Sequence, residues 1–162
     1  MKIKIFTTGG TFDKIYFDAK SEFQFADTII GELLEEANIS FDYDIVTLLE
    51  KDSLDMNDVD RKMIHDAVSN VKEDKILITH GTDTMVETAQ ALLDIRDKTI
   101  VLFGAMQPAR MRQSDATYNL GVACAAVQLL PAGVHLAMNG KIFDPCKVIK
   151  NRPQNRFEQT DT

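Results

Sequence analysis

The sequence has 162 residues, a length that suits one domain of ordinary size. Apolar residues make up 44% and charged residues 27%, which is typical of a globular protein that folds without a disulfide or a metal. The net charge of −7 argues against a nucleic-acid partner, because nucleic-acid binding requires a basic surface. The Lys and Arg residues between 141 and 156 are interpreted as a solvated segment that carries one functional lysine.

The sequence predicts no membrane partner, because no stretch of about 18 apolar residues is present. The start of the chain does not resemble a signal peptide, since Lys2 and Lys4 alternate with apolar residues. The two cysteines, Cys124 and Cys146, form neither a metal-binding nor a redox motif. These features lead us to expect a cytoplasmic protein.

The first half of the chain predicts a strand, a loop or hairpin, a helix, a strand and a second helix. In order they cover residues 3–6, 14–25, 27–37, 43–49 and 57–71. Gly9 and Gly10 break the first strand. Asp27 or Thr28 is expected to cap the first helix and Asn57 the second, because their side chains accept hydrogen bonds from free N–H groups.

The second half predicts strands and helices in alternation, followed by a strand pair. In order they cover residues 75–79, 83–93, 99–103, 114–130, 134–138 and 141–143. Asn139 and Gly140 form the turn between the last two strands. The helix at 114–130 is almost free of charge after Asp115.

Alternation of helices with continuously apolar strands indicates a mostly parallel sheet with helices on both faces. We therefore predict an α/β fold of the Rossmann or flavodoxin kind, in which ligands bind at the carboxyl ends of the strands. One domain is expected over residues 1–150. Residues 151–162 are expected to form a polar, exposed tail.

The first candidate site follows the first strand, where the chain reads Thr8, Gly9, Gly10 and Thr11. The glycines allow a sharp turn and close approach of the backbone to a ligand, so that Thr11 projects above the sheet. A purely structural turn is the simpler alternative. A phosphate-binding loop is not expected, because neither of the usual glycine-rich patterns is present.

The second candidate site follows the strand at 75–79, where the chain reads His80, Gly81, Thr82 and Asp83. Thr82 or Asp83 could cap the next helix. The helix start also offers N–H groups to an anionic ligand or a developing oxyanion. His80 is either a general base or a hydrogen-bonded structural group. The other two histidines share no ligand spacing with it, so no metal is expected.

These two segments belong to a longer series along the chain. The series is Thr8 to Thr11, residues 52–58, His80 to Thr84, residues 104–108 with Ser114, Asp115, Ala116 and Asn119, and Met138-Asn139 with Lys150. In this order the segments resemble the motifs of the bacterial-type asparaginase family, over nearly the whole chain up to Lys150. The resemblance implies the fold of the asparaginase N-terminal domain, hydrolysis of L-asparagine to L-aspartate and ammonia, and no cofactor.

The resemblance also implies two catalytic groups. Thr11 matches the threonine of a flexible N-terminal loop that is taken as the nucleophile, and Tyr16 is our candidate for the tyrosine that assists it. A packed aromatic residue is the alternative for Tyr16. Thr82, Asp83 and Lys150 match the second catalytic set.

Substrate-binding positions are implied in the same way. Ser53 matches a ligand of the substrate's α-carboxylate, and Asp83 resembles the residue that holds the α-amino group. Ala105 matches a position whose backbone helps to bind the side-chain amide. Gly10 and Thr82 complete the substrate-binding set.

The chain departs from the family pattern in two respects. The usual member has a second, C-terminal domain that supplies an acidic residue to a neighbouring subunit's site, and this sequence lacks it. We expect a naturally short form rather than a fragment. Leu54 stands after the loop serine, where the family often has glutamine. Both changes remove groups that hold the substrate's ammonium, so weak binding of asparagine is expected.

Several alternatives remain open from the sequence. A glutaminase, or a broader amidase that accepts D-amino acids or peptides, differs little in substrate chemistry. The amidase component of a transfer-RNA amidotransferase is disfavoured by the acidic charge. A non-catalytic amino-acid-binding module would not need two hydroxyls and a lysine. The apolar helix at 114–130, with Gly121 and several alanines, predicts a homo-oligomer. The resemblance implies that this is a homodimer or homotetramer.

Overall fold

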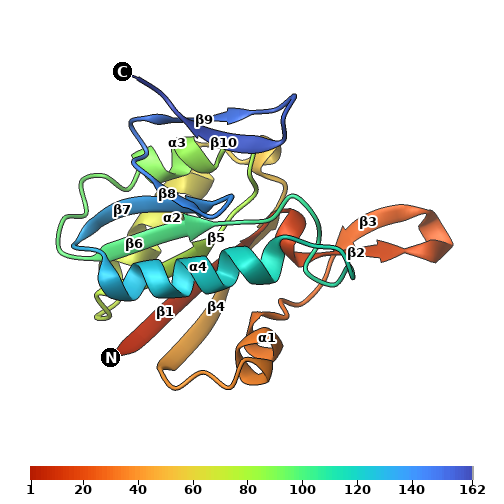
Figure 1. The fold of residues 1–162 in the computed structure, drawn as a ribbon, viewed down its shortest axis with the longest axis horizontal. Coiled ribbons are helices and arrows are strands. Elements are labelled where there is room, and N and C mark those ends of the chain that lie inside the picture. Colours follow the sequence, from red (N-terminus) through yellow and green to blue (C-terminus); the bar gives the residue numbers. More distant parts are fainter. Residues whose placement is uncertain (162) are drawn as a thin grey trace.

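The computed structural model describes residues 1–161 and has a six-stranded sheet at its centre (Figure 1). The strand order is β4-β1-β5-β6-β7-β8; neighbouring strands from β4 to β7 are parallel, and β8 is antiparallel to β7. The bounds are β1 Lys2–Gly9, β4 Asp42–Lys51, β5 Lys75–Thr79, β6 Thr99–Phe103, β7 Gly133–Met138 and β8 Lys141–Phe143. The predicted α/β fold class and these six predicted strands are confirmed.

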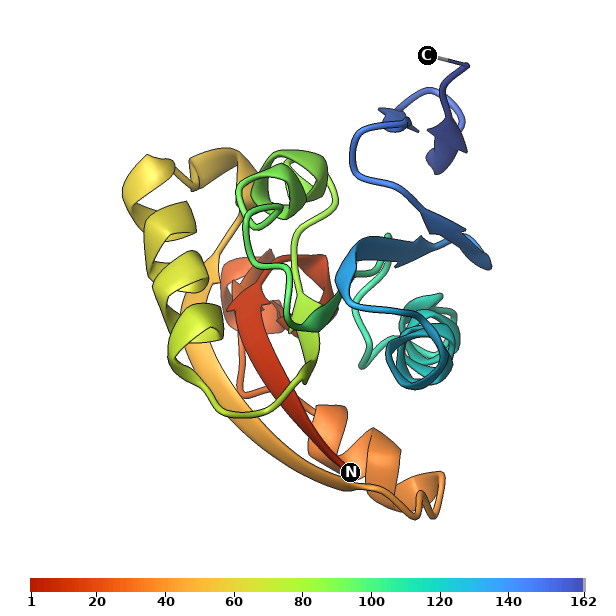
Figure 2. The same ribbon diagram turned by 90° about the vertical axis from the view of Figure 1, so that its left-hand side faces the viewer.

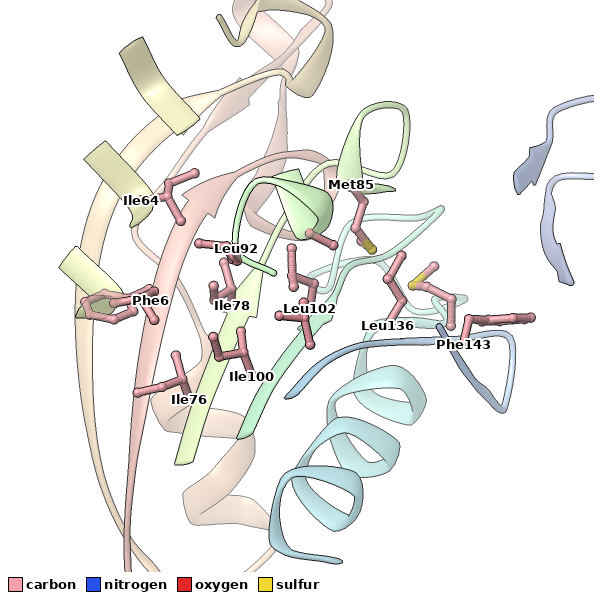
Figure 3. Close-up of a cluster of buried hydrophobic side chains, with 14 of the residues drawn as sticks. Phe6, Ile64, Ile76, Ile78, Met85, Leu92, Ile100, Leu102, Leu136 and Phe143 are labelled. Atoms are coloured by element: carbon pink, nitrogen blue, oxygen red, sulfur yellow. The ribbon is translucent and has the colours of Figure 1, made fainter. Parts of the chain in front are cut away.

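Four helices cover the two faces of this sheet (Figure 2). They are α1 Ile30–Glu36, α2 Asp58–Asn70, α3 Met85–Gln90 and α4 Ala116–Leu129. Because successive strand residues point to opposite faces, Ile76 and Ile78 pack with α2 and α3, whereas Leu77 packs with α1 and α4. Figure 3 shows the first of these two buried clusters. Burial on both faces explains why the strands are apolar without alternation.

Several local predictions are also confirmed. The side chain of Asn57 accepts hydrogen bonds from the N–H groups of Val59 and Asp60 and so caps α2. The carboxylate of Asp60 accepts in return from the Asn57 N–H, which completes a capping box. Asn139 and Gly140, with φ of 53° and 73°, form the turn between β7 and β8.

Two helix starts differ from the prediction. Helix α1 begins at Ile30 rather than at residue 27, with Ile29 at its N-cap position, so Asp27 does not cap it. The Asp27 carbonyl accepts from the Arg110 guanidinium. The Thr28 hydroxyl does accept from the Ile30 N–H, at 3.4 Å. Helix α3 is shorter than predicted, covering 85–90 with Thr84 at its N-cap position. Neither Thr82 nor Asp83 therefore caps it.

Residues 14–25 form a hairpin, one of the two predicted alternatives. Its strands are β2 Lys14–Phe17 and β3 Glu22–Phe25, and it projects away from the sheet (Figure 1). A short 3-10 turn, Thr11–Asp13, joins it to β1.

The segment predicted as a tail contains regular structure, although most of its residues are exposed as expected. Residues 148–159 form a second hairpin outside the central sheet, with strands β9 Val148–Asn151 and β10 Arg156–Gln159. Phe157 is buried, and its ring lies 6.4 Å from that of Phe143. The Phe157 N–H donates to the Asn139 side chain at 2.8 Å. Val148 and Phe157, one from each strand, thus attach the hairpin to the buried cluster of the domain. Over residues 1–161, none of the helices has the length and apolar character needed to cross a membrane.

Candidate active site

Loops from four parallel strands meet at the carboxyl edge of the sheet, and three glycines allow this contact. A Cβ atom on Gly10 would lie 2.5 Å from the Gly81 nitrogen, and one on Gly81 would lie 2.7 Å from the Ser53 hydroxyl. A Cβ on Gly104 would lie 2.3 Å from the His80 carbonyl oxygen. The loops after β1, β4, β5 and β6 therefore pack closely against one another. Any residue larger than glycine at these three positions would clash with the neighbouring loop.

Thr11 lies in the loop after β1, beside a cavity of about 200 Å³. The residues that line this cavity are Thr11, Lys14, Phe23, Met106, Gln107 and Pro108. The Lys14 ammonium forms an ion pair with Asp52 at 2.8 Å. The cavity is thus bounded by the first hairpin on one side and by the loop after β6 on the other.

Thr82, Asp83 and Lys150 are brought together directly. The Lys150 Nζ, from β9, donates to the Thr82 hydroxyl at 2.7 Å and to the Asp83 carboxylate at 2.9 Å. The Lys150 side chain is 13% exposed, so these two partners meet a largely buried cation. Thr82 is itself buried. The loops of Thr11 and of this trio adjoin at Gly10 and Gly81, although no hydrogen bond between described residues joins the two threonines.

Arg152 also reaches the trio, with its Nε 3.3 Å from the Asp83 carboxylate. Sequence reasoning missed this residue, because the basic cluster that contains it was interpreted as a solvated tail. Its position two residues after Lys150 is the signal that could have indicated it.

Ser53 is buried beside the start of α3. Its hydroxyl accepts from the Thr84 N–H at 3.3 Å, and its carbonyl accepts from the Thr84 hydroxyl at 2.7 Å. Since a serine hydroxyl both accepts and donates, its proton remains available for an anionic ligand.

Tyr16 lies on β2, half exposed, and its ring packs edge-on against Phe23 at 5.4 Å. Within residues 1–161, no hydrogen bond joins the Tyr16 hydroxyl to Thr11. This geometry is that of a packed aromatic residue on the hairpin, the alternative given above for Tyr16.

The loop at Ala105 is held by two residues of the α4 start that the sequence analysis assigned no role. The Asp115 carboxylate accepts from the N–H of Met106 at 2.9 Å and from that of Gln107 at 3.0 Å. The Asn119 amide donates to the Gly104 carbonyl at 2.9 Å and to Asp115 at 3.0 Å. Bonds to a charged acceptor are strong, so this loop is fixed against the site.

His80 has a structural environment. Its Nδ1 bonds to the Gly81 carbonyl at 2.7 Å, and its Nε2 bonds to the Thr88 hydroxyl at 2.7 Å. Burial lowers the pKa of His80 to about 4, against a smaller opposing effect of the Gly81 bond. The ring is neutral at physiological pH and both nitrogens are engaged, so His80 fits the structural alternative rather than a general base. Among residues 1–161, no group of three or more acidic, His or Cys side chains is arranged to hold a metal ion.

The fold and this site define a class of α/β proteins in which a threonine, a lysine and a carboxylate meet at the carboxyl edge of a parallel sheet. The family model described as "Asparaginase, N-terminal" matches residues 2–159. The chain therefore belongs to the asparaginase family.

Individual relatives agree. Over 131 residues, 76% of this chain and 37% of the relative, it is 37% identical to "Probable L-asparaginase periplasmic" of Haemophilus influenzae. It is 36% identical to a glutamyl-tRNA(Gln) amidotransferase protein of Methanococcus vannielii over 71% of this chain and 27% of the relative. The solved structure of the thermostable L-asparaginase from Thermococcus kodakarensis has a TM-score of 0.86 and 28% identity, covering 100% of this chain and 52% of that one. The chain thus spans about half, or less, of the length of these relatives.

Proposed function

We propose that this protein is an amidohydrolase that converts L-asparagine to L-aspartate and ammonia, with Thr11 as the nucleophile. The observation that carries the proposal is the buried Lys150 ammonium, which donates to Thr82 and to Asp83 on a loop that adjoins the loop of Thr11. A lysine with a purely structural role would need only a carboxylate partner such as Asp83. Lys150 also donates to the Thr82 hydroxyl, which lies in the loop after β5.

In the proposed reaction the Thr11 oxygen attacks the carbon of the side-chain amide. The threonine proton passes to the amide nitrogen, the C–N bond breaks and ammonia leaves. Water then hydrolyses the threonine ester, which releases aspartate and restores the hydroxyl. A threonine is a poor nucleophile until a base accepts its proton. Tyr16 takes this role if the hairpin moves towards Thr11, and otherwise Lys150 relays the proton through Thr82.

The same loops supply the proposed substrate contacts. The Ser53 hydroxyl binds the α-carboxylate, and Asp83 holds the α-amino group. The backbone at Gly10 lines the contact between the loops, where its φ of 73° excludes larger residues. Backbone N–H groups near Thr82 and Ala105 stabilise the oxyanion, at about 3 kcal/mol per donor. The hydrogen bonds that the Met106 and Gln107 N–H groups donate to Asp115 preorganise the Ala105 loop for this role.

The test measures ammonia release from asparagine by Thr11→Ala, Thr82→Ala and wild type. The matched control is Thr117→Ala, which removes an exposed hydroxyl from α4. We expect both site variants to lose at least ~100-fold in kcat/KM, the scale of a lost nucleophile or proton relay, while the control keeps the wild-type rate. Wild-type rates in both site variants would refute the assignment. Binding of asparagine without turnover by wild type would instead support an amino-acid-binding module.

Substrate range is tested with the same assay on glutamine and on the D-forms of both amides. One methylene group changes binding by only about 1–3 kcal/mol, so measurable glutaminase activity is compatible with this site. Asparagine is expected to give the highest kcat/KM. A larger value for glutamine would make the protein a glutaminase.

We also propose a homo-oligomer, either a dimer or a tetramer. Helix α4 has an exposed stripe of Tyr118, Gly121, Ala125 and Leu129, and Leu129 is 84% exposed. Small residues in the stripe allow close approach of a second copy. Light scattering on wild type and on Leu129→Lys tests this: a monomeric wild type contradicts the proposal. The cytoplasmic location stays a prediction.

A further inference from the structure

The first hairpin, β2 with β3, projects from the domain and is attached to it at its base (Figure 1). Three hydrogen bonds fix this base, and they run from the Ala26 N–H to the Asp13 carbonyl at 3.0 Å, from the Ala109 N–H to the Phe12 carbonyl at 3.1 Å, and from the Arg110 guanidinium to the Asp27 carbonyl. The donors of the last two bonds lie in the loop after β6, which also carries Ala105. This loop therefore holds both ends of the hairpin.

Two buried atoms at the base have no hydrogen-bond partner among residues 1–161. They are Oδ1 of the Asp13 carboxylate and Nη1 of the Arg110 guanidinium. Asp13 is 4% exposed, so its carboxylate is shielded from bulk water. A buried polar group without a partner is costly, and here one atom is an acceptor and the other a donor. A bond between Asp13 and Arg110 would satisfy both.

The groups around Asp13 favour such a bond. Burial raises the pKa of Asp13, a hydrogen bond from Thr28 and the charge of Arg110 lower it, and the charge of Glu50 raises it. Arg110 is thus the cation among these groups. The Thr28 hydroxyl also accepts from the Ile30 N–H at 3.4 Å, so it ties the carboxylate to the start of α1 and leaves Oδ1 unpaired.

The position of Asp13 in the chain connects this base to the candidate active site. Asp13 ends the 3-10 turn Thr11–Asp13 and directly precedes Lys14, the first residue of β2. A shift of Asp13 towards Arg110 therefore moves Thr11 and the hairpin together. In the described part of the chain no hydrogen bond joins Tyr16 to Thr11, so the proton transfer proposed for Tyr16 requires a movement of this kind.

From this geometry we propose that Asp13 and Arg110 form a clamp that positions Thr11 for attack on the substrate. The inference rests on the proposed function, in which Thr11 is the nucleophile. In one arrangement of the base the guanidinium bonds to the Asp27 carbonyl alone, and in the other it bonds to the Asp13 carboxylate as well. Neither clamp residue lines the Thr11 cavity, so both are positioning residues rather than catalytic ones.

The first experiment measures kcat and KM for asparagine in Asp13→Asn, in Arg110→Gln and in the double variant. The matched controls are Asp18→Asn and Arg112→Gln, at exposed positions near each clamp residue. Each single variant should lose about tenfold in kcat, because a small misplacement of a nucleophile slows its attack. The KM should stay unchanged, since the proposed substrate contacts remain. The double variant should lose no more than either single one, because the two residues act as a unit.

Urea unfolding at pH 7.5 separates this role from a merely structural one. Asp13→Asn removes a buried charge, so it should be at least as stable as wild type although its kcat is lower. A residue that only holds the fold together would lose stability and rate at the same time. Such a joint loss overturns the inference, and so do a wild-type kcat in either single variant or additive losses in the double variant.

Hydrogen exchange tests the clamp without turnover. The Ala26 amide bonds at the base of the hairpin, so it should exchange faster in Arg110→Gln than in wild type, while the amides of β5 keep their rates. Arg112→Gln should leave both unchanged. Faster exchange at Ala26 supports the clamp even if asparagine is not hydrolysed and the proposed function fails. Unchanged exchange overturns the clamp, and hydrolysis of asparagine in that case leaves the amidohydrolase intact.

Discussion

Replacing Asp13 by asparagine removes a buried charge next to the Thr11 loop. Asp13 is 4% exposed, and its Oδ1 has no hydrogen-bond partner among the described residues. Burial raises the pKa of Asp13 from 3.8 to about 6, and Glu50 adds a smaller rise. A hydrogen bond from Thr28 and the charge of Arg110 oppose that rise. Asparagine keeps the shape of the side chain and has no charge to bury.

The expected gain follows from the difference between the folded pKa of about 6 and the ordinary value of 3.8. At 1.36 kcal/mol for each pKa unit, ionised Asp13 destabilises the fold by about 3 kcal/mol above pH 6. The sign is fixed by proton binding: the folded state binds the proton more tightly, so stability is lost as pH rises from about 4 to about 6. Below pH 4 the carboxyl is protonated in both states, and the variant gains nothing.

The assay is urea unfolding of wild type and Asp13→Asn between pH 4 and pH 8. The variant should be more stable by about 2–3 kcal/mol at pH 7.5, and the difference should vanish near pH 4. Asp97→Asn, at an exposed position, is the control and should show no such pH dependence. A variant that is less stable than wild type at pH 7.5, or a difference independent of pH, would refute the reasoning.

His80 changes the free energy of unfolding in the opposite direction to Asp13 between about pH 4 and pH 6.5. Its pKa is lowered from 6.5 to about 4, so its contribution is complete above pH 6.5 and is lost as pH falls towards 4. In wild type the two slopes oppose each other. In Asp13→Asn the opposing contribution of Asp13 is absent, so we expect the free energy of unfolding to rise with pH between 4 and 6 more steeply than in wild type.

Three further changes test the packing. Gly10→Ala places a methyl group 2.5 Å from the Gly81 nitrogen at a φ of 73°, so urea unfolding should show a loss of at least ~2 kcal/mol; an unchanged midpoint would contradict the close contact of the loops. Asn57→Ala removes the capping box and should lower stability by about 1 kcal/mol, seen as a drop in Tm. Phe157→Ala should detach the second hairpin from Phe143 and abolish ammonia release, while far-UV circular dichroism shows the sheet intact; full activity would disprove the anchoring.

The sequence predicted the inner strands β5 and β6 because each is a short, mostly apolar run rich in β-branched residues. Local sequence patterns did not predict features that depend on contacts with residues far away in the chain. Helix α1 starts at Ile30, and the Asp27 carbonyl before it accepts from Arg110, a residue of the other half of the chain that no local pattern reveals. The second hairpin was not predicted because only Val148 and Phe157 in it are buried, which gives residues 151–162 no apolar period.

The residues of the candidate site were predicted from their positions and from a family resemblance rather than from periodicity. Thr11, Thr82 and Asp83 were candidates from their positions after strands, whereas Lys150 came from the resemblance alone, since no spacing rule relates residue 150 to residue 82. The contact between Lys150 and Thr82 depends on the docking of β9, a segment that the sequence pattern places at the boundary of a tail. Arg152 was not identified from the sequence because its contact with Asp83 depends on the same docking of the second hairpin. The catalytic roles of these residues stay predictions until the variants are assayed.

Because Lys150 reaches Thr82 from a hairpin outside the central sheet, the trio and the sheet depend on different segments of the chain. The contacts within the sheet do not require residues 148–159. We therefore expect limited proteolysis within the hairpin to separate Lys150 from Thr82 while the central sheet stays folded.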